Sequence, residues 1–153
     1  ICTMGTIKEA IKQRKFTNEY EKAIVNILFT ASWLDATNIQ YFKPYGISPQ
    51  QFNVLRILRG SYPNALRLSD ITERMIDKNS NATLLVEKLR TKNFVKREIC
   101  KHNRRQVDIW ITQKGLDLLA ELDKLRENFE EQFKGLSKQD VQQLNMLLDK
   151  MRG

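Results

Sequence analysis

The densest cluster of charged side chains in this chain lies between residues 78 and 105. This segment holds nine Lys or Arg and two Glu, a net charge of +7, whereas the whole 153-residue chain carries +8. A positive field concentrated in this way is typical of a surface that binds a phosphate backbone. A solvated basic face is the alternative interpretation. We favour nucleic-acid binding because the same residues also form a groove-sized helix and a loop-tipped hairpin.

Two short helices joined by a tight turn are predicted to position part of this charge. The first helix is expected from Ser69, as its N-cap, to Ile76, with Ile71, Met75 and Ile76 facing inward. The turn is expected near Asp77 and Lys78, and the second helix over roughly residues 79–92. This order is that of a helix-turn-helix.

The second helix has one apolar and one polar face. Ala82, Leu85, Val86 and Leu89 recur at i, i+3, i+4 and i+7, which predicts one buried stripe. The outward or marginal residues are Asn79, Ser80, Asn81, Thr83, Leu84, Glu87, Lys88 and Thr91. We expect the first turn to enter the major groove, where Asn and Ser can contact base edges. An ordinary amphipathic helix is the alternative.

A basic hairpin follows the second helix. Its strands are expected at residues 94–99 and 106–111, because Val107, Ile109 and Ile111 alternate with more polar residues. Asn93 is expected in the left-handed conformation that ends the helix, and Arg67-Leu68 is expected as a short third strand. At the tip, Arg104 and Arg105 could enter a minor groove, whose negative potential attracts Arg. A solubilising loop is the alternative.

Helices on both sides of this lobe have more apolar surface than one small subunit would bury. A short helix is expected from Thr6 to about Gln13, and a long one over residues 19–42, capped by Thr17 or Asn18 and apolar on two faces. Ser48 is expected to cap a further helix, with Gln51 completing a capping box. After Thr112, the predicted helix has a seam of Leu118, Leu122, Leu125 and Phe129, and the last helix presents Val141, Leu144, Leu147, Leu148 and Met151.

These seams predict an intertwined homodimer, with a monomeric helical cap as the alternative. We expect one domain overall, in which residues 1–46 and 113–153 form the dimerisation part and residues 47–112 the DNA-binding lobe. The predicted fold is mainly α with a small β-hairpin wing (α+β).

Other functional classes find little support. No Ser-His-Asp set, metal-ligand spacing or Gly-rich phosphate loop is present, and the single histidine, His102, lies on the hairpin tip. We therefore expect no catalytic residues, no metal and no cofactor. No apolar run of 18 residues and no signal peptide is visible, and the two cysteines, Cys2 and Cys100, make no disulfide framework. These features favour a cytoplasmic protein that does not enter a membrane.

Taken together, these stretches resemble the MarR family of bacterial winged helix-turn-helix transcription regulators. The matching stretches are residues 47–55 (ISPQQFNVL), 68–75 (LSDITERM), 85–89 (LVEKL), 103–105 (NRR) and 110–115 (WITQKG). Each motif alone is weak, whereas their order and spacing are specific.

The resemblance implies a homodimer that binds double-stranded DNA at a pseudo-palindromic operator, with a recognition helix in the major groove and a wing in the minor groove. The implied DNA-binding residues are Asn79, Ser80, Asn81, Thr83, Leu84, Lys88, Lys101, Arg104 and Arg105. Two positions depart from the family pattern. Asn103 stands where the family commonly has Asp, and Leu84 stands where Arg is frequent.

The resemblance also implies a repressor that releases DNA when a small phenolic or aromatic effector binds. Such an effector pocket could be lined by Trp33, Tyr41, Phe42 and Phe52, for which core packing is the alternative. Some relatives sense oxidants, and Cys100 beside Lys101 is the candidate thiol, because a basic neighbour lowers a thiol pKa. A winged-helix module that binds an acidic protein partner remains an alternative function.

Overall fold

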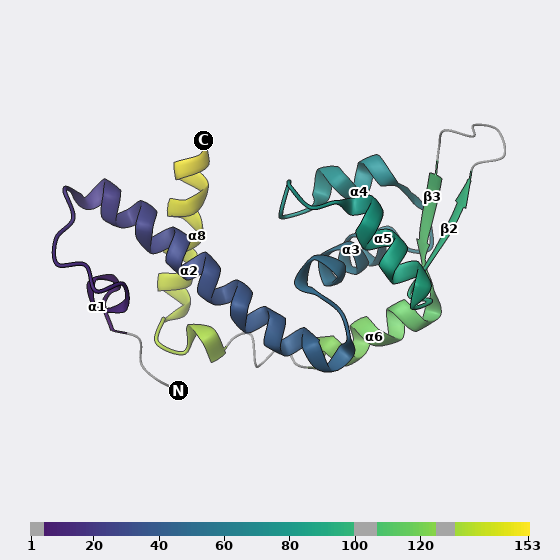
Figure 1. Cartoon of the computed structure of the whole chain (residues 1–153), viewed down its shortest axis with the longest axis horizontal. Helices are drawn as coiled ribbons and strands as arrows, with labels where there is room; N and C mark the ends of the chain where they lie inside the picture. Colours follow the sequence, from purple (N-terminus) through teal and green to yellow (C-terminus); the bar gives the residue numbers. More distant parts are fainter. Residues whose placement is uncertain (1–4, 100–106, 125–130) are drawn as a thin grey trace. The chain divides into compact units, whose positions relative to one another are not determined.

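The computed structural model describes residues 5–99, 107–124 and 131–153 (Figure 1). The chain divides into two compact units, residues 1–53 and 54–153. The functional division expected at residues 46 and 112 stays a prediction. Of the expected site residues, Lys101, Arg104 and Arg105 lie outside the described residues, as do Cys2, Cys100 and His102.

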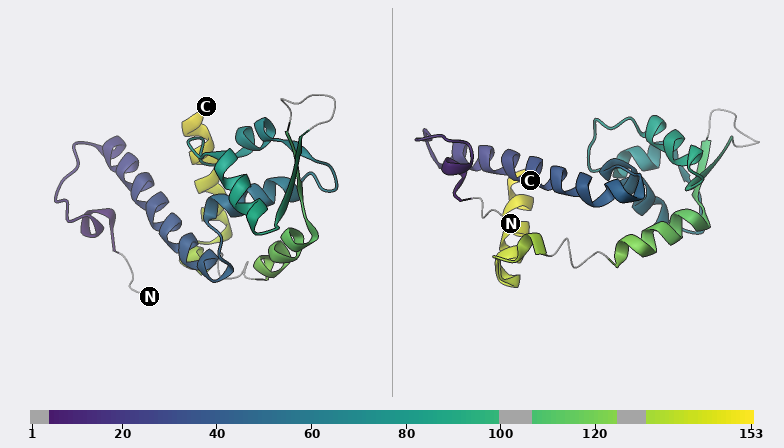
Figure 2. Two further views of the ribbon diagram at one scale, coloured as in Figure 1. Left: turned by 45° about the vertical axis from the view of Figure 1, so that its right-hand side comes forward. Right: turned by 60° about the horizontal axis from the view of Figure 1, so that its bottom comes forward.

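The first unit is dominated by one long helix. It contains α1 (Ile7–Ala10), α2 (Glu19–Phe42), the 3-10 turn η1 (Lys43–Tyr45) and the start of α3 (Pro49–Arg59). The bounds of α2 are those predicted, and it is a single uninterrupted helix in every view (Figure 2). Asn18 is its cap, because the Asn18 Oδ1 accepts from the Glu21 N–H at 2.9 Å. The helix α1 ends sooner than expected, and Lys12 follows it with a φ of 56°.

Local signals also end α2 and begin α3. Gly46 has a φ of 65°, a left-handed conformation that favours glycine. Ser48 and Gln51 then make the expected reciprocal cap: the Ser48 N–H donates to Gln51 Oε1 at 3.0 Å, and the Gln51 N–H donates to Ser48 Oγ at 3.1 Å.

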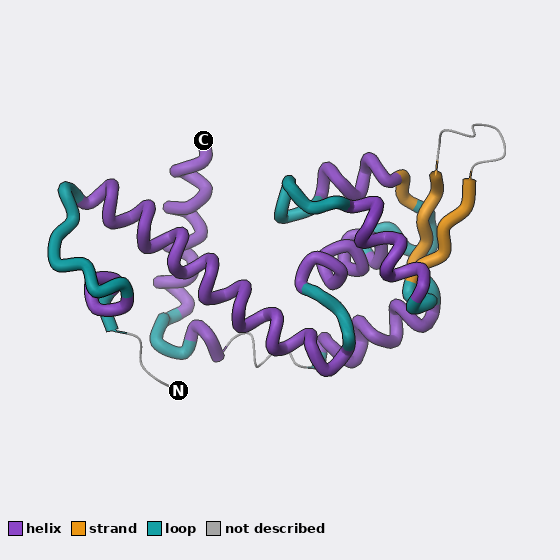
Figure 3. The backbone as a smooth tube through the Cα atoms, viewed as in Figure 1, coloured by secondary structure: helices purple, strands orange, loops and turns teal. Residues whose placement is uncertain are grey.

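The second unit contains a winged-helix lobe. After α3 come β1 (Leu66–Arg67), α4 (Leu68–Arg74), α5 (Ala82–Thr91), β2 (Val95–Ile99), β3 (Val107–Ile111) and α6 (Gln113–Asp123), followed by η2 (Glu131–Phe133) and α8 (Lys138–Arg152). The three strands form an antiparallel sheet in the order β1-β3-β2 (Figure 3). The expected mainly α fold with a β-hairpin wing and a short third strand is confirmed.

The core of this lobe collects one apolar side chain or more from almost every element. Its members are buried to 9 % exposure or less: Val54, Leu55, Leu58, Leu66, Ile71, Met75, Ala82, Val86, Leu89, Phe94, Val95, Ile109, Ile111, Leu119 and Leu122. The register pairs Val95 with Ile111 and Leu66 with Ile109, so the strands place their apolar side chains on one face of the sheet.

A tight junction joins α5, β2 and α6. Asn93 has the expected left-handed φ, 61°, and the Phe94 N–H donates to the Leu89 carbonyl at 3.0 Å. The Thr112 Oγ1 accepts from the Gly115 N–H at 3.1 Å and its hydroxyl donates to the Asn93 carbonyl at 2.8 Å. A Cβ on Gly115 would lie 2.4 Å from the Phe94 carbonyl oxygen, so only glycine fits here.

Two predicted details of the lobe were wrong. Ser69 does not cap α4, because the helix begins one residue earlier and the Asp70 Oδ2 accepts from the Arg67 N–H at 3.0 Å. Ile76 does not face inward and is 84 % exposed. Because α4 ends at Arg74 and Met75 is extended, Met75 is buried and the next side chain points away from it.

The apolar seam predicted on this helix for a dimer interface was partly wrong. Leu122 is buried with Leu119 in the core of the lobe itself, and Leu118 is half-buried. The approach of Gly115 to Phe94 and Ile111 orients the helix, and Leu119 and Leu122 follow it at i+4 and i+7. Leu125 and Phe129 lie outside the described residues.

Candidate nucleic-acid interface

The turn between α4 and α5 is held by one carboxylate. Asp77 accepts from the Asn79 N–H through Oδ1 at 2.9 Å and from the Ser80 hydroxyl through Oδ2 at 3.0 Å. The Lys78 ammonium donates to the Glu73 carbonyl oxygen. An Asp that bonds the backbone two residues on makes a compact turn of defined shape. This turn therefore presents α5 in a fixed direction beside α4.

Because of this turn, α5 begins three residues later than predicted. Asn79 and Ser80 belong to the turn, and Asn81 is the N-cap, whose Oδ1 accepts from the Leu84 N–H at 3.0 Å. The expected inward stripe is confirmed for Ala82, Val86 and Leu89, which are buried, whereas Leu85 is half-buried.

The opposite face of α5 is open to solvent. Thr83 and Lys88 are exposed, and Leu84 is 50 % exposed. The ribbon shows α5 between α4 and the β2–β3 hairpin, and α5 contacts both α4 and β2 (Figure 1). The structure thus brings together the six site residues predicted on the turn and helix, while the three on the wing tip lie outside its described part.

An ion-pair cluster links α5 to the wing strand. The Arg90 guanidinium donates to both Glu87 carboxylate oxygens, the shortest distance being 2.6 Å, and Arg97 Nη1 lies 3.8 Å from Glu87 Oε2. These three residues and Ile99 line an open groove of about 430 Å³. The hydrogen bond from Arg90 lowers the pKa of Glu87, and the same bond raises the pKa of Arg90.

Sequence reasoning missed this cluster. The Arg90 pairing at i+3 could have been found from helical spacing, but the Arg97 pairing depends on how β2 packs beside α5. Lys96 is paired in the same way, with Glu98 at 2.5 Å. Arg90, Arg97 and Lys96 therefore each have a carboxylate partner, and residues 78–99 still carry a net charge of +4. Lys88 is exposed and has no carboxylate partner within the described ranges.

The aromatic residues predicted for an effector pocket all lie in the first unit. Phe42 is 2 % exposed, and its ring stacks on that of Phe52 with the centroids 4.5 Å apart. Trp33 and Tyr41 are half-buried on α2. The two stacked rings pack against each other, and the effector pocket stays a prediction.

Other kinds of site have no candidate within the described ranges. No group of three His, Cys, Asp or Glu there could hold a metal ion. Across the same ranges, no helix is both long and apolar enough to cross a membrane.

Comparison with known proteins agrees with this architecture. Residues 47–107 match the model of the MarR family. The HTH-type transcriptional regulator YkoM of Bacillus subtilis is 32 % identical over 116 residues, which cover 74 % of this chain and 73 % of the relative. The HTH-type transcriptional repressor MdtR of the same organism is 32 % identical over 77 residues, and the chain spans about half of its length, 48 %.

Solved structures show the same fold. A MarR transcription factor from Planctomyces limnophilus has a TM-score of 0.69 at 27 % identity, covering 88 % of this chain and 98 % of that one. A mutant MarR from E. coli complexed with operator DNA has a TM-score of 0.77 at 22 % identity, covering 90 % and 99 %. The sequence relatives and the family model describe regulators of transcription rather than enzymes. This chain belongs to the MarR family of DNA-binding transcription regulators.

Proposed function

We propose that this protein is a homodimeric repressor that binds a pseudo-palindromic double-stranded DNA operator. The observation that carries the proposal is the exposed face of α5, which starts at a rigid Asp77 turn and lies beside the hairpin wing. The proposed contacts are made by Asn79, Ser80, Asn81, Thr83, Leu84, Lys88, Lys101, Arg104 and Arg105. A related fold, that of E. coli MarR, has been solved in complex with operator DNA.

Exposed apolar side chains on α2 and α8 support the homodimer. Tyr20, Ile24 and Leu28 on α2 are 84 %, 59 % and 66 % exposed, and no residue of α8 is buried. Monomeric soluble proteins rarely leave such contiguous stripes open to water. A second copy of the chain would cover them, and two recognition helices would then meet two half-sites of one operator.

A salt titration of duplex binding tests the DNA-binding part. If the dimer contacts ~6–10 phosphates, the logarithm of the affinity falls with the logarithm of salt concentration with a slope of about −5 to −9. Binding that ignores salt, or no binding at low salt, would contradict the proposal.

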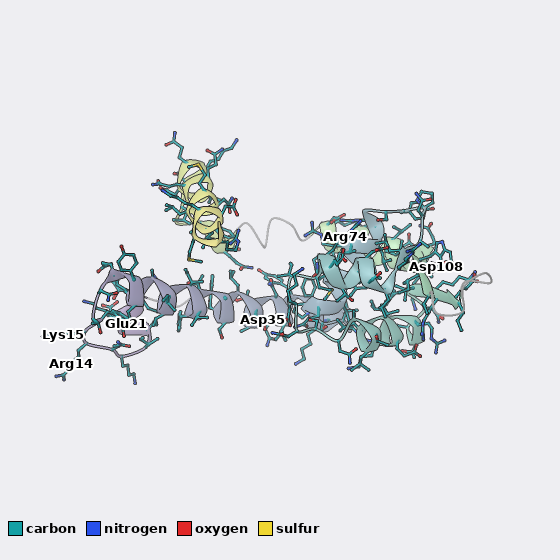
Figure 4. The ribbon with its side chains drawn as sticks, turned by 90° about the horizontal axis from the view of Figure 1, so that it is seen from above. Arg14, Lys15, Glu21, Asp35, Arg74 and Asp108 are labelled. Atoms are coloured by element: carbon teal, nitrogen blue, oxygen red, sulfur yellow. The ribbon has the colours of Figure 1, made fainter. Side chains whose placement is uncertain are left out.

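A matched pair of variants locates the interaction. Replacing both Arg104 and Arg105 by Ala should weaken binding and reduce the salt slope by about two, one unit for each phosphate that these side chains no longer neutralise. Replacing Arg14 and Lys15 by Ala removes the same charge from the segment before α2 (Figure 4) and should change the slope little. Equal effects in the two variants would point to a non-local charge effect instead of an interaction at the wing.

A small aromatic effector would act through the first unit. The regulator BpsR of Bordetella bronchiseptica, a similar fold, has its DNA binding regulated by 6-hydroxynicotinic acid, and MdtR is a repressor. We propose that an aromatic acid binds near Trp33, Tyr41, Phe42 and Phe52 and lowers operator affinity. Titration of the DNA complex with 6-hydroxynicotinic acid and other aromatic acids tests this, and Trp33→Phe should weaken the response if the pocket is there. Release that is unchanged in the variant would place the effector elsewhere.

A further inference from the structure

The outermost residue on the first turn of α5 is apolar. Positions 82, 86 and 89 form the buried stripe, so at 100° per residue Leu84 lies on nearly the opposite side of the helix. Leu84 is 50 % exposed, whereas every core residue of the lobe is exposed by 9 % or less. Leu84 therefore occupies the part of α5 that projects furthest from the core.

Three polar side chains near Leu84 are already engaged within the protein, whereas Thr83 and Lys88 are exposed. The Asn81 carboxamide oxygen caps the helix through the Leu84 N–H, and the Ser80 hydroxyl donates to Asp77. One turn further on, Glu87 accepts from Arg90 through both oxygens. A carboxylate held in this way is not offered to a cytosine amino group, and a capping amide oxygen is not offered to a base.

This arrangement decides what the centre of the helix face can recognise. In the major groove an alkyl side chain has one specific complement, the C5-methyl group of thymine, whereas the other bases present donors and acceptors there. We propose that Leu84 selects the operator by packing on a thymine methyl in each half-site. The proposal rests on the DNA-binding function proposed above and adds to it a defined base and the residue that reads it.

The test uses the full-length protein and duplexes recovered from a random pool by their binding to it. Each thymine is replaced in turn by uracil, which removes only the methyl group. One position in each half-site should weaken binding about fourfold, and both together roughly fifteenfold, because each methyl buries one carbon's worth of apolar surface. Cytosine replaced by 5-methylcytosine restores the methyl in a C·G pair and should recover part of any loss caused by a T·A to C·G change.

Variants assign the discrimination to Leu84. Leu84→Ala should bind the thymine and uracil duplexes equally, whereas Leu84→Met, which keeps an alkyl chain, should still prefer thymine. Ile76→Ala removes a similar alkyl group from an 84 % exposed site outside α5 and should leave the thymine preference unchanged. Wild-type protein that binds uracil and thymine duplexes equally, or a Leu84→Ala variant that keeps the full preference, overturns the inference and leaves the repressor proposal standing. Failure to bind any duplex at low salt overturns the repressor proposal itself.

Discussion

The winged-helix lobe buries its main apolar side chains, whereas the terminal helices leave many of theirs exposed. In the lobe, α5 buries Ala82, Val86 and Leu89, and the sheet buries Val95, Ile109 and Ile111. In α8 no residue is buried, and Leu144, Leu147 and Met151 are 39 %, 56 % and 61 % exposed. Both regions have amphipathic sequences, so the difference lies in whether the chain itself supplies a surface to cover the apolar stripe.

The local signals of α8 are nevertheless complete. The Ser137 N–H donates to Asp140 Oδ2 at 2.8 Å, and the Asp140 N–H donates to Ser137 Oγ at 3.2 Å, which is a full capping box. A helix of 15 residues is marginal in water without a packing partner. Caps therefore specify where α8 begins, whereas its stability has to come from another surface, which we propose is a second subunit.

The largest expected effect comes from a substitution in the core of the winged-helix lobe. Leu89→Ala, at a fully buried position of α5, should lower the free energy of unfolding by ~2–5 kcal/mol, because it leaves a cavity in the lobe core. Denaturant titration measures this, and the loss should not depend on protein concentration. Leu84→Ala makes the same change on the exposed face of the same helix and should stay within about 0.5 kcal/mol of the wild type. Similar losses at the two sites would contradict the assigned faces of α5.

The next effect concerns the terminal helices. Leu147→Glu places a carboxylate on the apolar stripe of α8, and it should weaken dimerisation about a hundredfold or more, because burying an unpaired charge costs several kcal/mol. Sedimentation velocity over a range of concentrations measures the shift. Gln142→Glu introduces the same charge on the other side of α8 and should leave the dimer intact. A wild-type protein that is monomeric at every concentration would contradict the proposed homodimer.

A smaller effect is expected from removing the carboxylate that pairs with two cations of the lobe. Glu87→Gln removes the carboxylate that pairs with Arg90 and Arg97, so both cations become available to phosphates. We expect a steeper dependence of DNA affinity on salt, by about one unit of slope for each cation that then binds a phosphate. Glu121→Gln, which breaks a comparable pair between α6 and its C-cap Lys124, is the control and should leave the slope unchanged. Weaker binding by the Glu87 variant would instead show that the cluster positions the wing.

The smallest effect is the pH response of the α8 cap. The hydrogen bonds from Ser137 lower the pKa of Asp140. The cap is therefore fully present above the ordinary pKa of an Asp, and it is lost as the pH falls through the lowered value. An NMR titration of Asp140 should show this pKa rising toward its ordinary range in Ser137→Ala and remaining low in Ser137→Thr, which keeps the hydroxyl. An unchanged pKa in the Ala variant would contradict the capping box.

Features that depend on neighbouring residues could be predicted from the sequence alone. The bounds of α2, its cap at one of two neighbouring residues, the reciprocal Ser48–Gln51 cap, the left-handed Asn93 and the alternation of β3 all match the structure. Each is set by a side chain that bonds to its own backbone nearby or by a short hydrophobic period, so no distant part of the chain is needed to specify it.

Tertiary structure decided the features that depend on packing direction. Ile76 is predicted as an inward residue of a continuing helix, but α4 ends at Arg74 and the extended Met75 takes the place in the core, which leaves Ile76 exposed. Leu122 was predicted for a dimer seam but faces the lobe core, because Gly115 packs against the Phe94 carbonyl and orients the helix. Arg97 reaches Glu87 because β2 lies beside α5. In each case the neighbouring residues allow more than one helix end, buried face or ion pair. The surface against which the element packs selects one of them.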